Sequence, residues 1–153
     1  MGDFDISVIV RNLPLLWEGM QLTLLLTALA MVGGIVLGTV LALARLSGFA
    51  PLSFVATTYI NFFRSLPLIL VIFWFYFLVP LALGRPVGGV YSVLIAFTLF
   101  EAAYYAEVIR AGLISVGRGQ VAAARALGMR YHQVMMDVVL PQAFHAMPTL
   151  LLT

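Results

Sequence analysis

Two long uncharged stretches constrain the fold of this chain more than any other feature. A run of 26 residues without a charge separates Glu18 from Arg45, and a run of 20 separates Arg64 from Arg85. A membrane-spanning helix needs about 20 mostly apolar residues. The composition, 63% hydrophobic and only 9% charged, excludes an ordinary soluble domain. We therefore predict a single all-α domain, integral to the membrane, over residues 1–153.

The predicted spans are about 19–44, 64–84 and 87–109, with a partial fourth span at 141–153. The uncharged run of the third span, Pro86 to Ala106, exists only if Glu101 is set aside. The chain is interpreted as truncated at the start of its fourth span. Residues 46–63 are also uncharged, but their Gly, Pro, Ser, Thr and Asn make them poor lipid contacts. They form either an interfacial or a membrane-embedded segment, and the sequence leaves both open.

The arginines indicate the orientation. Cytoplasmic loops carry an excess of basic residues. With three complete spans and a periplasmic N-terminus, six arginines lie inside the cell and two outside. If residues 46–63 also crossed the membrane, the N-terminus would have to lie in the cytoplasm to keep six arginines inside and two outside. Residues 110–140 are cytoplasmic in both arrangements. The six inside are Arg45, Arg64, Arg110, Arg118, Arg125 and Arg130. The start of the chain, MGDFDISVIV, lacks a basic region and does not resemble a cleaved signal peptide.

Several function classes have little support in the sequence. The arginines are scattered rather than clustered on one face, which argues against nucleic-acid binding. The two histidines, His132 and His145, have no acidic neighbours at ligand spacing, so we predict no metal site. No catalytic constellation and no phosphate-binding Gly loop occurs, so we predict neither an enzyme nor an ATPase.

A polar insert between residues 119 and 141 stands out in this apolar chain. Its Ala-rich part predicts a short helix over Gln120–Leu127, because Ala is the best intrinsic helix former. Gly128 stands where a left-handed C-terminal cap is expected. The segment Tyr131–Leu140 predicts a second helix. Pro141 either ends this helix or begins the next one. The predicted order is helix, glycine turn, helix and then membrane.

This insert resembles the cytoplasmic coupling loop of ABC-importer permeases, whose signature is Glu-Ala-Ala, three residues, Gly, nine residues, Ile, any residue, Leu-Pro. The residues that match or replace that pattern are Ala123, Ala124, Gly128, Val138, Leu140 and Pro141, with Ala122 in the place of the Glu. The segments RSLPLIL, AYYAEVIRAG and LPQAF are similar to the polar amino-acid branch of the family. The longer FEAAYYAEVIRAG is most similar to the glutamate/aspartate permease subunits.

The resemblance implies a type I ABC-importer permease, a helical bundle of about five spans in the bacterial inner membrane. It implies that the 113–140 loop docks on an ATPase dimer, with Arg125 and Leu127 also at the contact. It further implies a second permease subunit, identical or different, and a periplasmic amino-acid-binding protein. ATP would be used by the ATPase, and this chain would bind no cofactor. The alternative from another class is a non-transporting membrane scaffold or an inactive permease fragment.

Two further groups of residues are candidates for specific roles. Glu101, with Tyr104 and Tyr105 one turn away, either lines a polar substrate path or is a structural carboxyl group. Glu107 and Arg110, three residues apart, are expected to pair on one helix face.

A ridge of small residues in the first span lets another helix approach closely. Its members are Ala30, Gly34, Gly38 and Ala42. We favour packing within the subunit over a specific dimer seam.

Overall fold

The computed structural model describes residues 10–151, and every regular element in that range is helical. The elements are α2 (Leu13–Leu46), α3 (Ala50–Arg64), α4 (Leu68–Phe73), the π-helical η1 (Trp74–Leu78), α5 (Val79–Leu83), α6 (Gly89–Ser115), α7 (Arg118–Ala126), α8 (Tyr131–Gln133), the π-helical η2 (Val134–Val139) and α9 (Leu140–Leu151). The expectation that no signal peptide is present falls mostly on residues 1–9, outside the described range.

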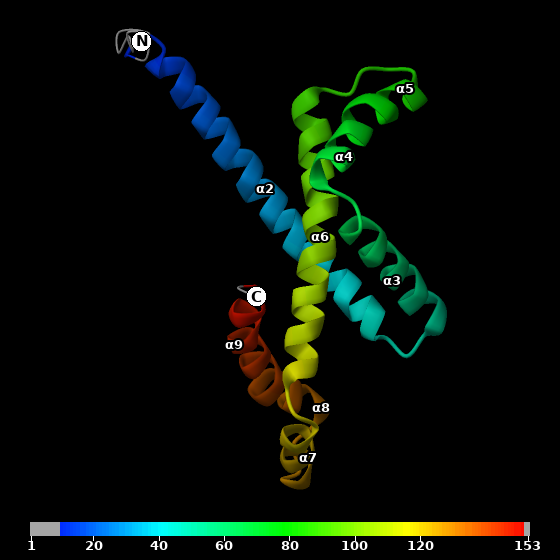
Figure 1. Cartoon of the computed structure of the whole chain (residues 1–153). Coiled ribbons are helices and arrows are strands. Elements are labelled where there is room, and N and C mark those ends of the chain that lie inside the picture. The colour runs from blue at the N-terminus through cyan, green and yellow to red at the C-terminus, as the bar shows by residue number, and fades with distance from the viewer. Residues whose placement is uncertain (1–9, 152–153) are drawn as a thin grey trace, which may run out of the picture.

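The core of the fold is the crossing of α2 and α6 (Figure 1). The buried residues of α2 are the predicted ridge, Ala30, Gly34, Gly38 and Ala42. On the facing helix, Ala102 and Ala106 are fully buried. A Cβ added to Gly38 would lie 2.9 Å from the Ala102 carbonyl oxygen, so the two backbones are in close contact. The favoured interpretation of the ridge, packing within the subunit, is confirmed.

Residues 46–63, whose location the sequence left open, are mostly helical. They form the turn after α2 and nearly all of α3, which packs on both α2 and α6. Tyr59 donates a hydrogen bond from its hydroxyl to the Leu99 carbonyl oxygen of α6 at 2.8 Å. In Figure 1, α3 and α4 meet beside α6, and their far ends point away from each other.

The second span was predicted to begin at about residue 64; in the structure Arg64 ends α3 and the next helix begins at Leu68. Pro67 is extended (φ −71°, ψ 139°). A proline disfavours helical backbone at the residue before it, here Leu66. The helical pair 50–64 and 68–83 is therefore bent by 104°.

Both π-helical segments lie shortly before a proline. Pro80 follows η1 and Pro141 follows η2, each two residues beyond the segment's end. A proline inside a helix lacks its N–H, and its ring clashes with the carbonyl group four residues earlier. Those carbonyls belong to Tyr76 and Asp137, which lie within the π segments, where the turn is wider. As a result Pro141 does not stop the predicted second helix, and helical backbone continues from Tyr131 to Leu151.

Two helices in the described range are long and apolar enough to cross a membrane by themselves, α2 and α6. They contain nearly all of the predicted spans 19–44 and 87–109. The bent pair formed by α3 with α4–α5 qualifies as a third span only when it is taken together. The predicted partial fourth span corresponds to α9, which lies beside the lower half of α6 in Figure 1; residues 152 and 153 are outside the described range.

Candidate functional site

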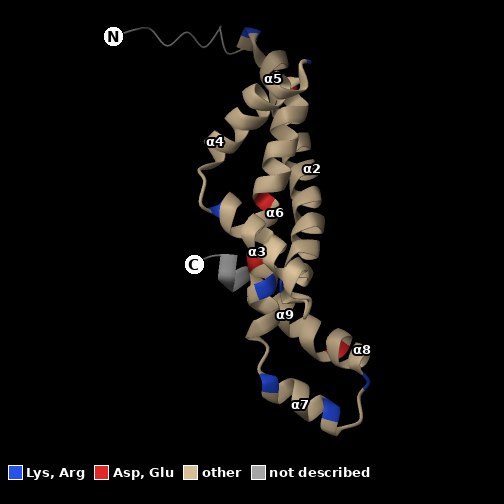
Figure 2. Ribbon diagram, turned by 90° about the vertical axis from the view of Figure 1, so that its right-hand side faces the viewer, with Lys and Arg blue, Asp and Glu red and all other residues tan. Residues whose placement is uncertain are grey.

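Three helices bring their charged residues together around one carboxylate. Glu107 of α6 forms ion pairs with Arg110 on its own helix, with Arg45 at the end of α2, and with Arg64 at the end of α3. The Arg64 Nη1 atom lies 3.8 Å from Glu107 Oε2. We call these four residues the Glu107 cluster. In Figure 2, basic segments lie beside an acidic segment of α6 where α2 and α3 approach it.

The sequence predicted only one pair of this cluster. Glu107 and Arg110 pair as expected from their spacing of three residues. The contributions of Arg45 and Arg64 were missed, because both arginines were used only to predict the orientation of the chain in the membrane. Their convergence depends on how α2 and α3 pack on α6. One signal in the sequence could have found them. Arg45, Arg64 and Arg110 stand at the predicted cytoplasmic ends of three spans, and Glu107 is the acidic residue at that same end of the third span.

The structure separates the three residues predicted to line a substrate path. Glu101 and Tyr105 face α2, since a Cβ added to Gly34 would lie 3.1 Å from the Glu101 Cβ and 3.2 Å from the Tyr105 ring. Tyr104 lies on the side facing α3, where the Arg64 guanidinium is 5.6 Å from its ring centroid. Tyr104 also contacts the Phe100 ring. Glu101 and Tyr104 therefore do not share one lining surface.

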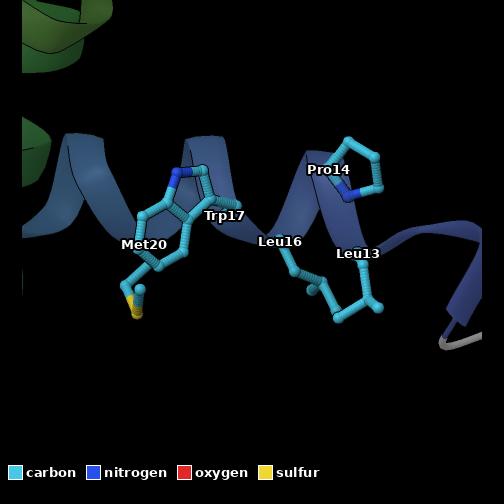
Figure 3. Close-up of a pocket in the computed structure, with 5 residues that line it drawn as sticks. All are labelled: Leu13, Pro14, Leu16, Trp17 and Met20. Carbon is cyan, nitrogen blue, oxygen red and sulfur yellow. The ribbon is translucent and has the colours of Figure 1, made fainter.

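Two large hollows are almost entirely apolar. A cavity of about 530 Å³ lies between α2, α6, η2 and α9, with Tyr105, Ile109 and Phe144 in its wall. Neither Glu101 nor Tyr104 lines it. The second hollow, shown in Figure 3, is formed by Trp17, Met20 and other apolar side chains of α2 alone. Surfaces of this kind suit lipid or another apolar helix rather than a polar substrate.

The predicted polar insert folds into a small hairpin beyond the end of α6 (Figure 1). The short helix runs over Arg118–Ala126 rather than Gln120–Leu127. Ala124 is buried against Val134 and Val139 of η2. These contacts hold α7 against the helical segment that leads into α9.

The outer face of α7 is exposed. Leu127 is 84% exposed. Four further exposed residues are Ala122, Ala123, Arg125 and Ala126. Among the two alanines that match the family signature, Ala123 points outward whereas Ala124 serves the hairpin itself.

The remaining signature residues support the hairpin from behind. Val138 packs on the cluster formed by Ala124, Val134 and Val139. Leu140 lines the apolar cavity between α6 and α9. Pro141 is exposed in the first turn of α9. Most signature residues therefore determine how α7 packs on η2, and few of them lie on the exposed surface of α7.

Gly128 ends α7 in the left-handed conformation, as the sequence predicted, with φ 80°. Its N–H donates to the Arg125 carbonyl oxygen at 2.9 Å, and the N–H of Met129 donates to the Ala124 carbonyl oxygen at 3.2 Å. This pair of hydrogen bonds is the Schellman arrangement, which satisfies the last carbonyl groups of a helix. The glycine thus fixes the direction in which the chain leaves α7.

Replacing Gly128 by valine is expected to loosen α7. A Cβ at this position would meet no atom within 4 Å, so the cost is conformational rather than steric. Left-handed backbone costs an L-residue roughly 1–2 kcal/mol, which should speed amide hydrogen exchange in α7 by about 5- to 30-fold. Hydrogen exchange with mass spectrometry on the detergent-solubilised protein measures this.

Gly119→Val is the matched control, since Gly119 also has open space around it but lies inside α7 without a positive φ. Its exchange should stay the same or slow. Equal effects of the two substitutions would show that the turn at Gly128 is not what holds α7.

The described residues contain no group of three or more His, Cys, Asp or Glu side chains that could hold a metal ion. His145 bonds through Nδ1 with the Pro141 carbonyl oxygen of its own helix at 2.7 Å.

Comparison with known proteins identifies the class to which this chain belongs, a membrane transport component. Residues 34–153 match the family described as "Binding-protein-dependent transport system inner membrane component". The chain belongs to this family and is a multi-pass inner-membrane permease subunit of an ABC amino-acid importer.

Two individual relatives are amino-acid permeases. The chain is 50% identical over 160 residues to the glutamate/aspartate import permease protein GltK of Escherichia coli O6:H1, with 100% of this chain and 71% of the relative covered. It is 40% identical to the probable glutamine ABC transporter permease protein GlnM of Bacillus subtilis, with 91% of this chain and 64% of the relative covered.

A solved structure of an amino acid ABC transporter with histidines superimposes with a TM-score of 0.87 at 33% identity, covering 98% of this chain and 70% of that one. The MetNI methionine ABC transporter superimposes with a TM-score of 0.62 at 24% identity, with 97% of this chain and 68% of that one covered, and at that identity the likeness shows the fold alone.

Proposed function

We propose that this chain is the membrane subunit of an ATP-driven importer for acidic amino acids, glutamate and aspartate. The observation that carries the proposal is the 50% identity, over the whole chain, to a glutamate/aspartate import permease. The glutamine and arginine permeases among the relatives are less similar, at 40% and 37%. The helices form part of the translocation pathway, together with a second permease subunit.

In this proposal α7 is the element that contacts the ATPase. Its support is the exposed apolar end at Leu127 on a helix that contacts the rest of the described chain on its other side. ATP binding and hydrolysis by the partner would move α7, and the hairpin would pass the motion through η2 to α9. Alternating access of this kind needs rigid elements, and the buried Ala124 and Val134 contacts make α7 and η2 one unit.

The proposed acidic substrate restricts the role that Glu101 can have. A carboxylate in direct contact with an acidic substrate would repel it. The placement of Glu101 against Gly34 of α2 supports a role in packing or in shaping the path from behind. The earlier alternative of a structural carboxyl group is therefore the one that we propose.

Uptake of radiolabelled amino acids tests the substrate class. The chain is produced in cells that lack glutamate uptake, together with its ATPase and binding protein, and uptake of glutamate, aspartate, glutamine and arginine is compared. We expect uptake of the two acidic amino acids alone. Uptake of glutamine or arginine instead would refute the acidic substrate, and no uptake despite normal assembly would favour the non-transporting scaffold.

The proposed orientation, with a periplasmic N-terminus and a cytoplasmic α7, has its own test. The natural chain has no cysteine, and Gln120 is exposed, so Gln120→Cys adds one reactive thiol. A membrane-impermeant maleimide should label it in inverted vesicles and not in intact spheroplasts. Labelling in spheroplasts would reverse the orientation and remove α7 from the ATPase side. A cysteine at Arg85, between α5 and α6, should show the opposite pattern.

A further inference from the structure

The Glu107 cluster carries an unbalanced positive charge. Three guanidinium groups surround a single carboxylate, and no other acidic side chain of residues 10–147 forms an ion pair with them. The formal charge of the cluster is therefore +2. An excess of positive charge at the end of a span attracts anionic groups.

The arginines also have hydrogen-bond donors to spare. Glu107 accepts from Arg45 and from Arg110 through its two oxygens. Arg64 is 3.8 Å away, too far for a hydrogen bond, and its side chain is 40% exposed. A guanidinium group has five N–H donors in a planar fork that matches a phosphate in a bidentate way. Arg64 can thus bind a second anion without giving up an existing hydrogen bond.

The position of the cluster along the helices matches the level of lipid phosphates. Arg45 is the first charged residue after the 26-residue uncharged run of α2. Since Arg64 and Arg110 both reach Glu107, all three guanidinium groups lie close to the level at which that run ends. This level is the boundary between hydrocarbon and headgroups, where basic side chains meet phosphates.

We infer that the Glu107 cluster binds the phosphate of an anionic phospholipid, with Arg64 as the principal contact. The leaflet is the inner one if the proposed orientation holds, but the binding itself does not depend on the orientation or on the transported substrate. The ligand class is a phosphodiester with acyl chains and a net negative charge, as in phosphatidylglycerol.

Native mass spectrometry of the full chain in detergent, titrated with phosphatidylglycerol or phosphatidylcholine, tests the inference. We expect preferential retention of phosphatidylglycerol. An arginine near anionic lipid contributes about 1 kcal/mol, so Arg64→Gln should weaken retention of phosphatidylglycerol by about fivefold. Arg118→Gln, which removes an arginine from the exposed α7, is the matched control and should leave retention unchanged. Equal retention of the two lipids, or equal effects of the two variants, would overturn the inference.

A variant with the opposite expected sign separates binding from damage to the fold. Glu107→Gln raises the charge of the cluster from +2 to +3 and should strengthen retention of phosphatidylglycerol, whereas loss of structure would weaken it. Inorganic phosphate and L-glutamate are the soluble arms of the experiment. Neither should displace the lipid at millimolar concentration. Displacement by phosphate would assign the cluster to a free anion, and displacement by glutamate would assign it to the substrate path. Either result contradicts the lipid site, as does weaker retention in Glu107→Gln when its Tm equals that of the parent.

Discussion

Adding a single methyl group at Gly38 is expected to disrupt the packing of the two main spans. A Cβ there would lie 2.8 Å from the Tyr105 Cβ, 2.9 Å from the Ala102 carbonyl oxygen and 3.0 Å from the Ala106 nitrogen. Two of these atoms are backbone, so α2 and α6 must move apart to admit it. Overpacking of this kind costs about 1–3 kcal/mol, and more for a larger side chain. Gly38→Ala should lower the Tm of the detergent-solubilised protein by several degrees, and Gly38→Val should prevent a folded species in size-exclusion chromatography.

Gly19→Ala is the control for this substitution. It adds the same methyl group to the same helix, at a position where nothing lies within 4 Å. Alanine has the higher helix propensity, so this variant should be as stable as the parent or slightly more so. A Tm loss in Gly19→Ala equal to that in Gly38→Ala would mean that a general property of α2, rather than its contact with α6, sets the stability.

Features encoded within a few residues of the chain could be predicted from the sequence. The apolar runs predicted α2 and α6, and the four-residue spacing of small side chains predicted their contact face. Gly128 followed from an Ala-rich helix that needs a left-handed end. In each case the physical cause is local to the segment. The causes are the length of the apolar run, the small side chains that let helices approach closely, and the backbone freedom of glycine.

Features that depend on tertiary packing were missed. Arg45 and Glu107 are 62 residues apart, and no pattern in the sequence relates them. The 104° bend before α4 has a local signal, Pro67, but the uncharged run after Arg64 was interpreted as one uninterrupted span. The continuation of the helix through Pro141 depends on a π segment, which widens the turn at a place that sequence rules treat as a stop.

The candidate site was predicted in part for the same reason. The signature located the hairpin, but it gave Ala123 and Ala124 equal weight, although only the first is exposed. Which of two adjacent residues faces a partner is decided by where η2 packs. Glu101, Tyr104 and Tyr105 were grouped because they are close in sequence, yet consecutive positions on a helix point in different directions, and Tyr104 faces Arg64 while Tyr105 faces α2.

The substitution Leu127→Asp is expected to abolish assembly with the ATPase while the chain still folds. Leu127 is 84% exposed, so a carboxylate there disturbs no contact within this chain. In the proposed docking, Ala123, Ala126 and Leu127 enter an apolar groove on the partner, where an aspartate would be desolvated without a counter-charge. Burying an unpaired charge at an interface costs several kcal/mol, which corresponds to more than a hundredfold loss of affinity. Co-purification of the ATPase with the tagged permease complex measures the loss.

The neighbouring arginine provides the comparison that identifies the nature of the contact. Arg125 is exposed on the same helix, and an ion pair at the rim of an interface contributes less than about 1 kcal/mol, so Arg125→Ala should weaken assembly by at most about fivefold. Ala122 stands where the family signature has Glu. The contact therefore lacks one charge and depends on the fit of apolar side chains. Assembly should then persist at 1 M salt, where charges are screened beyond about 3 Å, and Leu127→Met should assemble normally because it keeps an apolar side chain of similar volume. If Arg125→Ala or high salt dissolved the complex while Leu127→Asp left it intact, the contact would be electrostatic and Leu127 would lie outside it.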